Sequence, residues 1–270
     1  MTALVATAPM PPLVGPISSM ALQLDPTLVM RRSGLVPDDW QAELIRDGED
    51  WWLLLCTRQG GKTQGISALA LATALNTKGA LILILTPSER QSKEVLRCVS
   101  QYYFALFGVP FRSDAITVLK IELPNGSRII ALPGSTEKTI RVYAGVDLLL
   151  VDEAARVPDD VFYTVMPMLA VSGGRMVCAS TPWFSRGFMY REWKDGGGLW
   201  RRITITADDC PRIDRKFLAR EKRTKPEAWF AQEYYCKWGS AAAALFPADM
   251  VDSLLSRDVA AYLPNRGRFI

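Results

Sequence analysis

The sequence predicts an α/β fold, in which a central, mostly parallel sheet is flanked by helices on both faces. Three observations predict it. Five apolar runs are each short enough to be a buried strand, helical stretches separate most of them, and a loop containing two glycines follows the first run. The predicted strands are residues 51–56, 81–86, 147–151, 175–180 and 201–206.

The composition fits one large domain, or one domain with an appendage, because 49% of the 270 residues are apolar. The absence of histidine excludes histidine metal sites and a histidine general base. Five cysteines lack the short paired spacing of zinc sites and favour a reducing compartment. With a net charge of +4, any surface for nucleic acid must be local. No segment is long and apolar enough to span a membrane, so we expect no membrane association.

Along the chain, residues 1–24 are expected to form an extended arm, because prolines interrupt their apolar residues. Residues 25–47 are mainly helical by pattern, and Pro37 opens a helix that carries Trp40 and Gln41. Further helices are predicted at residues 65–76, 88–107 and 159–170.

A β-hairpin insertion is predicted where residues 116–123 and 127–133 flank Pro124-Asn125-Gly126. From Asp208 onward the pattern becomes charged and helical, through residues 215–222 and 226–238. This predicts a small C-terminal subdomain beside the sheet.

The first predicted strand runs directly into Cys56-Thr-Arg-Gln-Gly-Gly-Lys-Thr63, the pattern of a phosphate-binding loop. Glycines let consecutive backbone N–H groups turn toward phosphate oxygens, and the following helix directs its dipole at the anion. We expect Lys62 to lie between the β- and γ-phosphates of ATP and Thr63 to join the Mg²⁺ shell. The loop residues expected to bind the nucleotide are Arg58, Gln59, Gly60, Gly61, Lys62, Thr63 and Gln64. The alternative is a glycine-rich turn beside an incidental lysine, since Cys56 stands where the usual pattern has glycine.

Two carboxylates, Asp152 and Glu153, directly follow the predicted strand 147–151. Open α/β sheets place their ligands at this end of the strands. We expect Asp152 to hold Mg²⁺ opposite Thr63, and Glu153 to orient and deprotonate the attacking water. The alternative is a helix N-terminus that favours acidic residues.

The predicted strand 175–180 leads into Ser180-Thr181-Pro182, so we expect the hydroxyl groups of Ser180 and Thr181 beside the γ-phosphate. The alternative is an ordinary strand-end turn, in which such residues are also common. Two arginines compete to stabilise the transition state. Arg58 lies inside the loop of the same chain, whereas Arg141 precedes the strand with Asp152 and is a candidate for donation to a neighbouring subunit. The alternative for either is a solvated or ion-paired surface arginine.

With these motifs, the sequence resembles the ATPase (motor) domain of the large terminase subunit of tailed bacteriophages. The matching segments run in order from Trp40 to Phe246 and are Trp40-Gln41, residues 58–63, 135–141, 151–158, 179–183 and 229–236. In that family a non-glycine start to the loop is ordinary. The resemblance implies an ASCE-type P-loop ATPase, in which Gln41 reads the adenine, Arg141 is a trans arginine finger, and residues 180–182 couple hydrolysis to movement.

The resemblance also implies a function: driving double-stranded DNA through a portal ring into a procapsid, in the host cell cytoplasm. The implied partners are DNA bound without sequence preference, the portal and procapsid, the small terminase subunit, and further copies of this chain in a ring of five, with a monomer in isolation. The implied domains are an arm (1–24), the ATPase core (25–206), a lid subdomain (207–245) and a linker toward a nuclease domain (246–270). Because Asp249, Asp252 and Asp258 are too few for a nuclease site, we expect ATPase activity without DNA cleavage.

Two other functions fit parts of the pattern. A RecA-like helicase or translocase also uses such motifs, but it usually needs a second RecA-like domain. A nucleotide-binding scaffold is disfavoured because Lys62, Thr63, Asp152 and Glu153 are all present. Three basic segments are candidates for the DNA track, namely residues 186–191, 201–202 and 212–225.

Overall fold

The computed structural model describes residues 19–48, 51–111, 116–117, 119–133 and 143–239, and the described strands form one sheet in the order β3-β4-β5-β2-β6-β7-β1-β8. The pairs β3–β4 and β4–β5 are antiparallel and the other pairs are parallel, which confirms the predicted mostly parallel sheet. The strands are β1 (Trp51–Cys56), β2 (Leu81–Thr86), β3 (Ile116–Thr117), β4 (Lys120–Glu122), β5 (Arg128–Pro133), β6 (Leu148–Asp152), β7 (Arg175–Ser180) and β8 (Trp200–Ile205).

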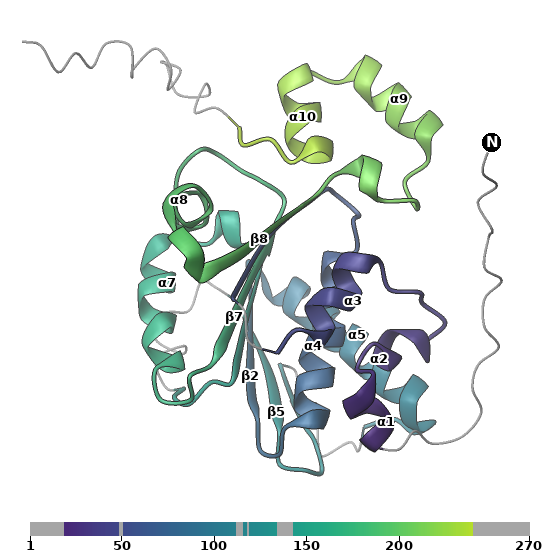
Figure 1. The fold of residues 1–270 in the computed structure, drawn as a ribbon, viewed down its shortest axis with the longest axis vertical. Helices are drawn as coiled ribbons and strands as arrows, with labels where there is room; N and C mark the ends of the chain where they lie inside the picture. The colour runs from purple at the N-terminus through teal and green to yellow at the C-terminus, as the bar shows by residue number, and fades with distance from the viewer. Residues whose placement is uncertain (1–18, 49–50, 112–115, 118, 134–142, 240–270) are drawn as a thin grey trace, which may run out of the picture.

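Helices cover both faces of this sheet (Figure 1). In β1, Trp52 and Leu54 belong to the core beneath α4 and α5, whereas Leu53 and Leu55 belong to the core beneath α7 and α8. All four are fully or almost fully buried, as expected for a central strand whose side chains alternate between two apolar layers. The helices are α1 (Ser19–Leu24), α2 (Leu28–Arg31), α3 (Asp39–Arg46), α4 (Lys62–Asn76), α5 (Glu89–Phe107), α7 (Asp159–Val165), α8 (Phe188–Asp195), α9 (Arg215–Thr224) and α10 (Glu227–Tyr235).

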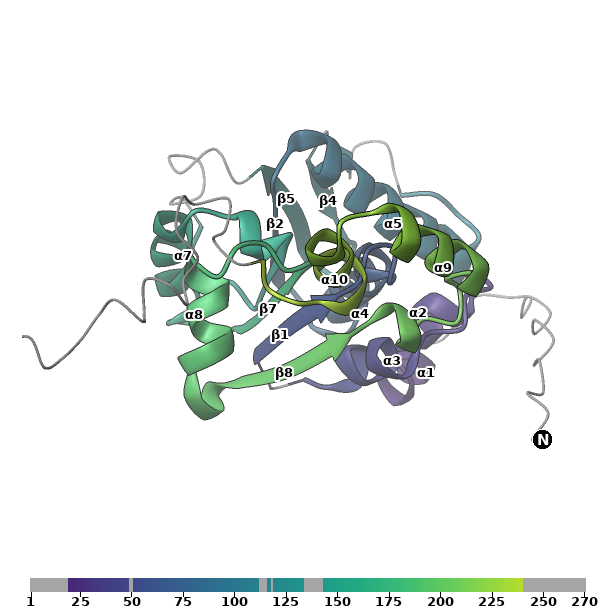
Figure 2. The same cartoon turned by 90° about the horizontal axis from the view of Figure 1, so that it is seen from above.

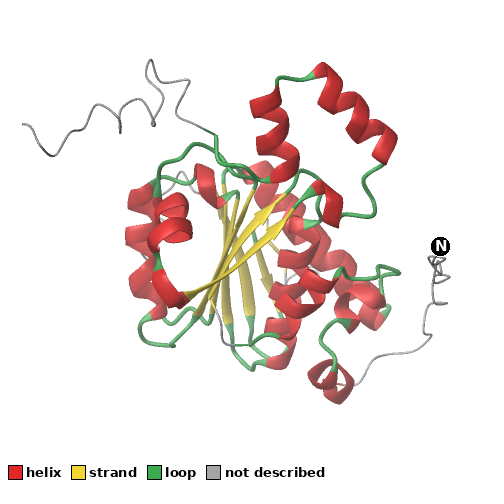
Figure 3. Ribbon diagram, turned by 45° about the horizontal axis from the view of Figure 1, so that its top comes forward, coloured by secondary structure: helices red, strands yellow, loops and turns green. Residues whose placement is uncertain are grey.

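The strand order places one strand between the two that carry the main motifs. β7 pairs with β1 on one side and with β6 on the other, and all three are parallel. The phosphate-loop strand and the strand ending at Asp152 are therefore separated by an additional strand, as the expected ASCE-type sheet requires. The carboxyl ends of all three meet at one edge of the sheet (Figure 3).

The predicted hairpin forms, but it belongs to the main sheet. Leu123 N–H donates to the carbonyl of Ser127 at 2.8 Å across the turn, and Gly126 has the positive φ of 84° that such a turn requires. β5 then pairs in parallel with β2 along its whole length. The segment therefore extends the edge of the sheet, because its second strand is apolar enough to be buried.

Two expectations about secondary structure are wrong. Residues 19–24 are helical rather than extended, because Leu22 packs into the core. The predicted helix 159–170 ends as an α-helix at Val165, and the tighter 3₁₀ turn Met166–Leu169 follows, since Pro167 cannot donate the next helical hydrogen bond. The helix α8 at residues 188–195 was not predicted.

The predicted C-terminal helical unit is present as α9 and α10. These helices lie above the carboxyl ends of the strands (Figures 1 and 2). None of the helices among the described residues has the length and apolar character needed to cross a membrane.

Candidate functional site: a nucleotide cavity at the strand ends

The loop after β1 has the backbone that a phosphate cradle needs. Gln59 and Gly61 both have positive φ, 59° and 89°, and α4 begins directly afterwards at Lys62. Gly60 faces Cys56 so closely that a Cβ there would lie 2.4 Å from the cysteine sulfur. Cys56 is completely buried beneath the loop, and burial raises the pKa of its thiol. The residue therefore fills space under the loop as a neutral side chain.

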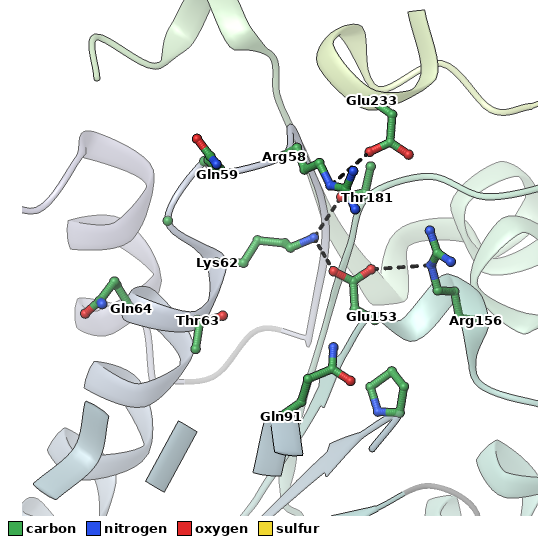
Figure 4. A pocket seen from close by; sticks show the side chains of 13 residues that line it. Arg58, Gln59, Lys62, Thr63, Gln64, Gln91, Glu153, Arg156, Thr181 and Glu233 are labelled. Atoms are coloured by element: carbon green, nitrogen blue, oxygen red, sulfur yellow. Dashed lines mark hydrogen bonds and ion pairs between the residues drawn. The ribbon is translucent and has the colours of Figure 1, made fainter. Parts of the chain in front are cut away.

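Lys62 extends across the cavity to the strand tips. Its Nζ donates to Glu153 Oε1 at 2.8 Å and to Thr181 Oγ1 at 2.9 Å (Figure 4). The lysine side chain is 10% exposed and the glutamate 21%, so this ion pair is largely shielded from water. Three predicted site residues from the ends of β1, β6 and β7 thus meet at one point.

Glu153 turns away from its strand through an unusual backbone conformation. Its φ of 51° lies in the left-handed region, which a residue other than glycine seldom adopts. Its Oε2 accepts a hydrogen bond from Ser180 Oγ at 3.4 Å and lies 3.8 Å from Nε of Arg156. The carboxylate therefore has hydroxyl and cationic neighbours from two elements.

Asp152 lies just below, at the end of β6. Its side chain is 4% exposed, and one carboxylate oxygen accepts the Glu153 N–H at 2.9 Å. Burial raises the pKa of Asp152 to about 6, although the Lys62 charge opposes this shift. A carboxylate in this position can be charged at neutral pH at a cost that a bound cation would offset.

Lys62, Glu153 and Thr181 line a cavity of about 580 Å³, whereas the buried Asp152 and Ser180 do not border it. It is lined by residues 58–64 and by Pro87, Gln91, Glu153, Arg156, Thr181 and Glu233. The loop residues expected to bind nucleotide are therefore all at one cavity.

Two residues from the C-terminal unit hold the same region, and the sequence reading did not single out their roles. The carbonyl of Glu233 in α10 accepts hydrogen bonds from Arg58 N–H at 3.0 Å and Thr57 Oγ1 at 3.1 Å. The buried Glu233 carboxylate lies 3.4 Å from Nε of Arg58. Gln232 Nε2 donates to the Pro182 carbonyl at 3.0 Å. The sequence signal that could have identified Glu233 is a charged residue between aromatic residues in one predicted helix, since such a charge needs a partner when it is buried.

Two predicted nucleotide ligands use their side chains elsewhere in this structure. Gln41 donates to the Gly61 carbonyl at 3.0 Å and accepts the Asp38 N–H at 2.9 Å, so it ties α3 to the loop. Gln64 borders the cavity, but its amide bonds to the Tyr102 hydroxyl and contacts Cys98 Sγ. Arg141, the predicted trans finger, lies outside the described residues, as do Asp249, Asp252 and Asp258.

Residues 53–252 match the family described as "Terminase large subunit, T4likevirus-type, N-terminal". The chain belongs to this family, and the predicted resemblance to the ATPase domain of phage large terminases is confirmed. None of the curated proteins compared with the chain matches it.

Several solved structures with the same fold are phage terminases. A mutant of the large terminase ATPase domain of Thermus phage P74-26 is 18% identical with a TM-score of 0.66, covering 77% of this chain and 97% of that one. The large terminase of bacteriophage HK97 is 18% identical with a TM-score of 0.54, covering 74% and 43%. That of a thermophilic bacteriophage, in complex with ADP, is 12% identical with a TM-score of 0.58, covering 75% and 54%. The chain thus spans about half the length of the two complete terminases.

Asp152 generates a testable pH dependence. Its pKa is raised in the folded protein, so the stability that its protonation contributes is fully present below about pH 4 and is lost as pH rises through about 6. Asp152→Asn removes this loss. Without metal or nucleotide, the unfolding free energy of the variant should gain about 2–3 kcal/mol on wild type between pH 4 and pH 8.

Urea unfolding of both proteins in a chelator measures this difference. A difference that stays constant across the pH range would contradict the assignment. If Asp152 holds Mg²⁺ as expected from the sequence, added Mg²⁺ and nucleotide should reverse the order at pH 8.

Proposed function

We propose that this chain binds ATP and Mg²⁺ in the cavity, hydrolyses ATP, and uses the reaction to move double-stranded DNA into a procapsid. The observation that carries the proposal is the 2.8 Å contact between Lys62 and Glu153 across the cavity. It joins a phosphate-binding lysine to a carboxylate that can serve as general base. Family membership and the ADP-bound terminase support a nucleotide as the ligand.

Phosphate binding follows from the loop. Its backbone N–H groups and the N-terminus of α4 would hold the phosphate oxygens, and Lys62 would add its charge. On binding, Lys62 is proposed to turn from Glu153 to the phosphates, because their oxygens carry more negative charge than one carboxylate. In the structure Glu153 neutralises the Lys62 charge, and a bound phosphate would replace Glu153 as the anion beside Lys62.

The residues present fit a magnesium ion. Mg²⁺ prefers oxygen ligands and usually takes one or two carboxylates together with substrate phosphates and water. Thr63 provides a hydroxyl at the cavity, and Asp152 provides a buried carboxylate next to Glu153, which lines the cavity. When bound, the ion would neutralise charge on the phosphates.

For hydrolysis, Glu153 is proposed to orient a water and accept its proton once Lys62 has left. Thr181 and Ser180 contact Lys62 and Glu153 respectively, so the tip of β7 can register whether the two are paired. Arg58, with a side chain 63% exposed at the cavity rim, is the candidate same-chain contact to the γ-phosphate. Gln41 is our candidate for binding the adenine, and for this it must exchange its hydrogen bonds with Gly61 and Asp38 for bonds with the base.

Glu153→Gln tests both roles of the carboxylate. We expect ATP turnover to fall at least about 100-fold, because the general base is lost. The affinity for ADP and ATPγS should stay or rise by about 3–10-fold, because Lys62 no longer has an ionic competitor inside the protein. Steady-state turnover and equilibrium titration measure the two effects.

Glu43→Gln is the matched control, since Glu43 on α3 forms an exposed ion pair with Arg201 on β8. Its turnover and affinity should equal those of wild type. Unchanged turnover in Glu153→Gln would remove the catalytic assignment.

Among the three basic segments, α9 is our proposed DNA contact. In the other two, Arg191 pairs with Asp159, Arg201 with Glu43, and Arg202 donates to the carbonyls of residues 192, 197 and 200. In α9 the exposed basic residues are Arg215, Lys216, Arg220, Lys222 and Arg223, of which Arg215 pairs with Asp208. A row of lysines and arginines on one exposed helix suits sequence-independent contact with phosphates.

Lys222→Glu combined with Arg223→Glu should weaken binding to a short DNA duplex at least about 10-fold at low salt. The slope of log affinity against log salt should become less steep by about 2, because two phosphate contacts are lost. Fluorescence anisotropy with two unrelated duplexes checks both. The control is Lys93→Glu with Arg97→Glu on α5, which has the same charge change on another exposed helix. Equal losses in both double variants would refute a specific role for α9.

A ring of copies, with Arg141 donated in trans, is proposed from the family relationship. Arg141→Ala and Lys62→Ala should each be inactive alone, because one lacks the finger and the other the phosphate ligand. Mixed, they should recover activity at shared sites that contain an intact Lys62 and a neighbour's Arg141. Specific activity of wild type should rise with protein concentration. No recovery on mixing, with a linear rate for wild type, would contradict the trans mechanism.

The portal, the procapsid and the small terminase subunit are the proposed partners, and the host cell cytoplasm is the proposed location. Residues 25–206 are the proposed ATPase core and 207–245 the proposed lid, of which the structure describes 207–239.

A further inference from the structure

Arg156 borders the cavity and lies inside the matching segment 151–158, but none of the roles given above is assigned to it. It ends the short 3₁₀ turn Ala154–Arg156 that follows Glu153. Its side chain is 37% exposed, borders the cavity, and places Nε 3.8 Å from Glu153 Oε2 (Figure 4). Among the described residues, Lys62 and Arg156 are the two cations within 4 Å of the Glu153 carboxylate.

The guanidinium of Arg156 is held in place by an aromatic ring. Its central carbon lies 3.9 Å from the ring centroid of Trp183. A planar guanidinium stacks well on indole, and in a stacked arrangement its N–H groups point along the plane of the guanidinium, parallel to the ring. Trp183 follows directly on Ser180-Thr181-Pro182, so the ring is attached to the tip of β7.

The backbone of Trp183 is in turn fixed to the chain beyond α10. Gly239 N–H donates to the Trp183 carbonyl at 2.7 Å, and Ser185 N–H donates to the Gly239 carbonyl at 2.9 Å. Gln232 of α10 binds the Pro182 carbonyl. Arg156 therefore connects the Glu153 carboxylate to a segment anchored by the C-terminal unit.

The charge balance at Glu153 shows why this contact matters. In the present structure Lys62 makes the shorter and more direct contact, at 2.8 Å against 3.8 Å for Arg156. Under the proposed function Lys62 turns to the phosphates. Arg156 and the Ser180 hydroxyl are then the described neighbours that remain to hold the carboxylate, which has a strained backbone and would otherwise be free to rotate.

We propose that Arg156, stacked on Trp183, is a positioning residue that takes over Glu153 from Lys62 when nucleotide binds and holds it toward the attacking water. This inference rests on the proposed hydrolysis at the same site. It assigns Arg156 no contact with phosphate. Misplacement of a catalytic group by about 1 Å can cost 100-fold in rate, so a positioning residue has a measurable effect.

The test compares five single variants with wild type. Arg156→Ala removes the contact, and Arg156→Lys keeps the charge without the planar group. Trp183→Leu removes the stacking surface, and Trp183→Phe keeps an aromatic face. Arg186→Ala is the matched control, because Arg186 lies over the neighbouring Phe184 ring at 5.3 Å and does not border the cavity.

For each variant, kcat, the KM for ATP, the Kd values for ADP and ATPγS, and the melting temperature are measured. Arg156→Ala should lower kcat about 10–100-fold while both Kd values stay within about twofold of wild type. Trp183→Leu should lower kcat about 3–10-fold, because the cation loses its support. Arg156→Lys should be intermediate, and Trp183→Phe and Arg186→Ala should stay near wild type.

Two results would overturn the inference. One is an unchanged kcat in both Arg156→Ala and Trp183→Leu. The other is a large loss of ATPγS affinity in Arg156→Ala with ADP affinity unchanged, since that marks a γ-phosphate ligand. If Arg156→Ala melts at too low a temperature to assay, the comparison of Trp183→Leu with Trp183→Phe decides.

The proposed function fails separately. Absence of ATP turnover in wild type, or full turnover in Glu153→Gln, would refute hydrolysis at this site. If wild type hydrolyses ATP and Glu153→Gln does not, the proposed function stands. A fully active Arg156→Ala would then refute only the role of Arg156.

Discussion

The ion pair between Lys62 and Glu153 is the interaction on which the site depends. Its partners are 91 residues apart and come from strands that do not touch, with β7 between them. Both are mostly withdrawn from water, and a shielded charge is costly unless an opposite charge is near. Without phosphate, each neutralises the other. With phosphate, the lysine has a stronger anionic partner, and the glutamate becomes available for chemistry. Exchange of one anion for another is thus a simple way to link binding to the readiness of the base.

The parallel sheet makes this exchange possible. Because β1, β7 and β6 run in the same direction, their carboxyl ends bring the loop, Thr181 and Glu153 to one edge. The helices on both faces bury β6 and β7 completely and all of β1 except Trp51, so the three strand ends are fixed by core packing. The C-terminal helix α10 adds a further constraint, since Glu233 holds the start of the phosphate loop and Gln232 holds the tip of β7. A displacement of the phosphate loop or of the tip of β7 would therefore change the hydrogen bonds of α10.

The basic residues illustrate how tertiary contacts sort a sequence signal. The sequence offered three basic segments as candidates for the DNA track and did not rank them. Folding gives Arg191, Arg201 and Arg202 partners within the protein, and it leaves α9 as an exposed helix above the strand ends. Its place next to α10 puts the proposed DNA contact in the same unit that touches the nucleotide site.

The sequence by itself determined the strands, the phosphate loop, the carboxylate pair and the family, because each is a local pattern: an apolar run of strand length, glycines next to a lysine, two acids after a buried strand. It also predicted the helices α4 and α5 closely, since their periodicity is long. Only the tertiary structure decided features that depend on distant partners. Residues 19–24 form a helix because Leu22 packs into the core. The hairpin joins the sheet because β2 has a free edge with which β5 can pair. Gln41 binds both the phosphate loop and the start of α3 because α3 packs against α4. Arg156 and Glu233 belong to the site because neighbouring elements fold toward it, and no spacing in the chain records that proximity.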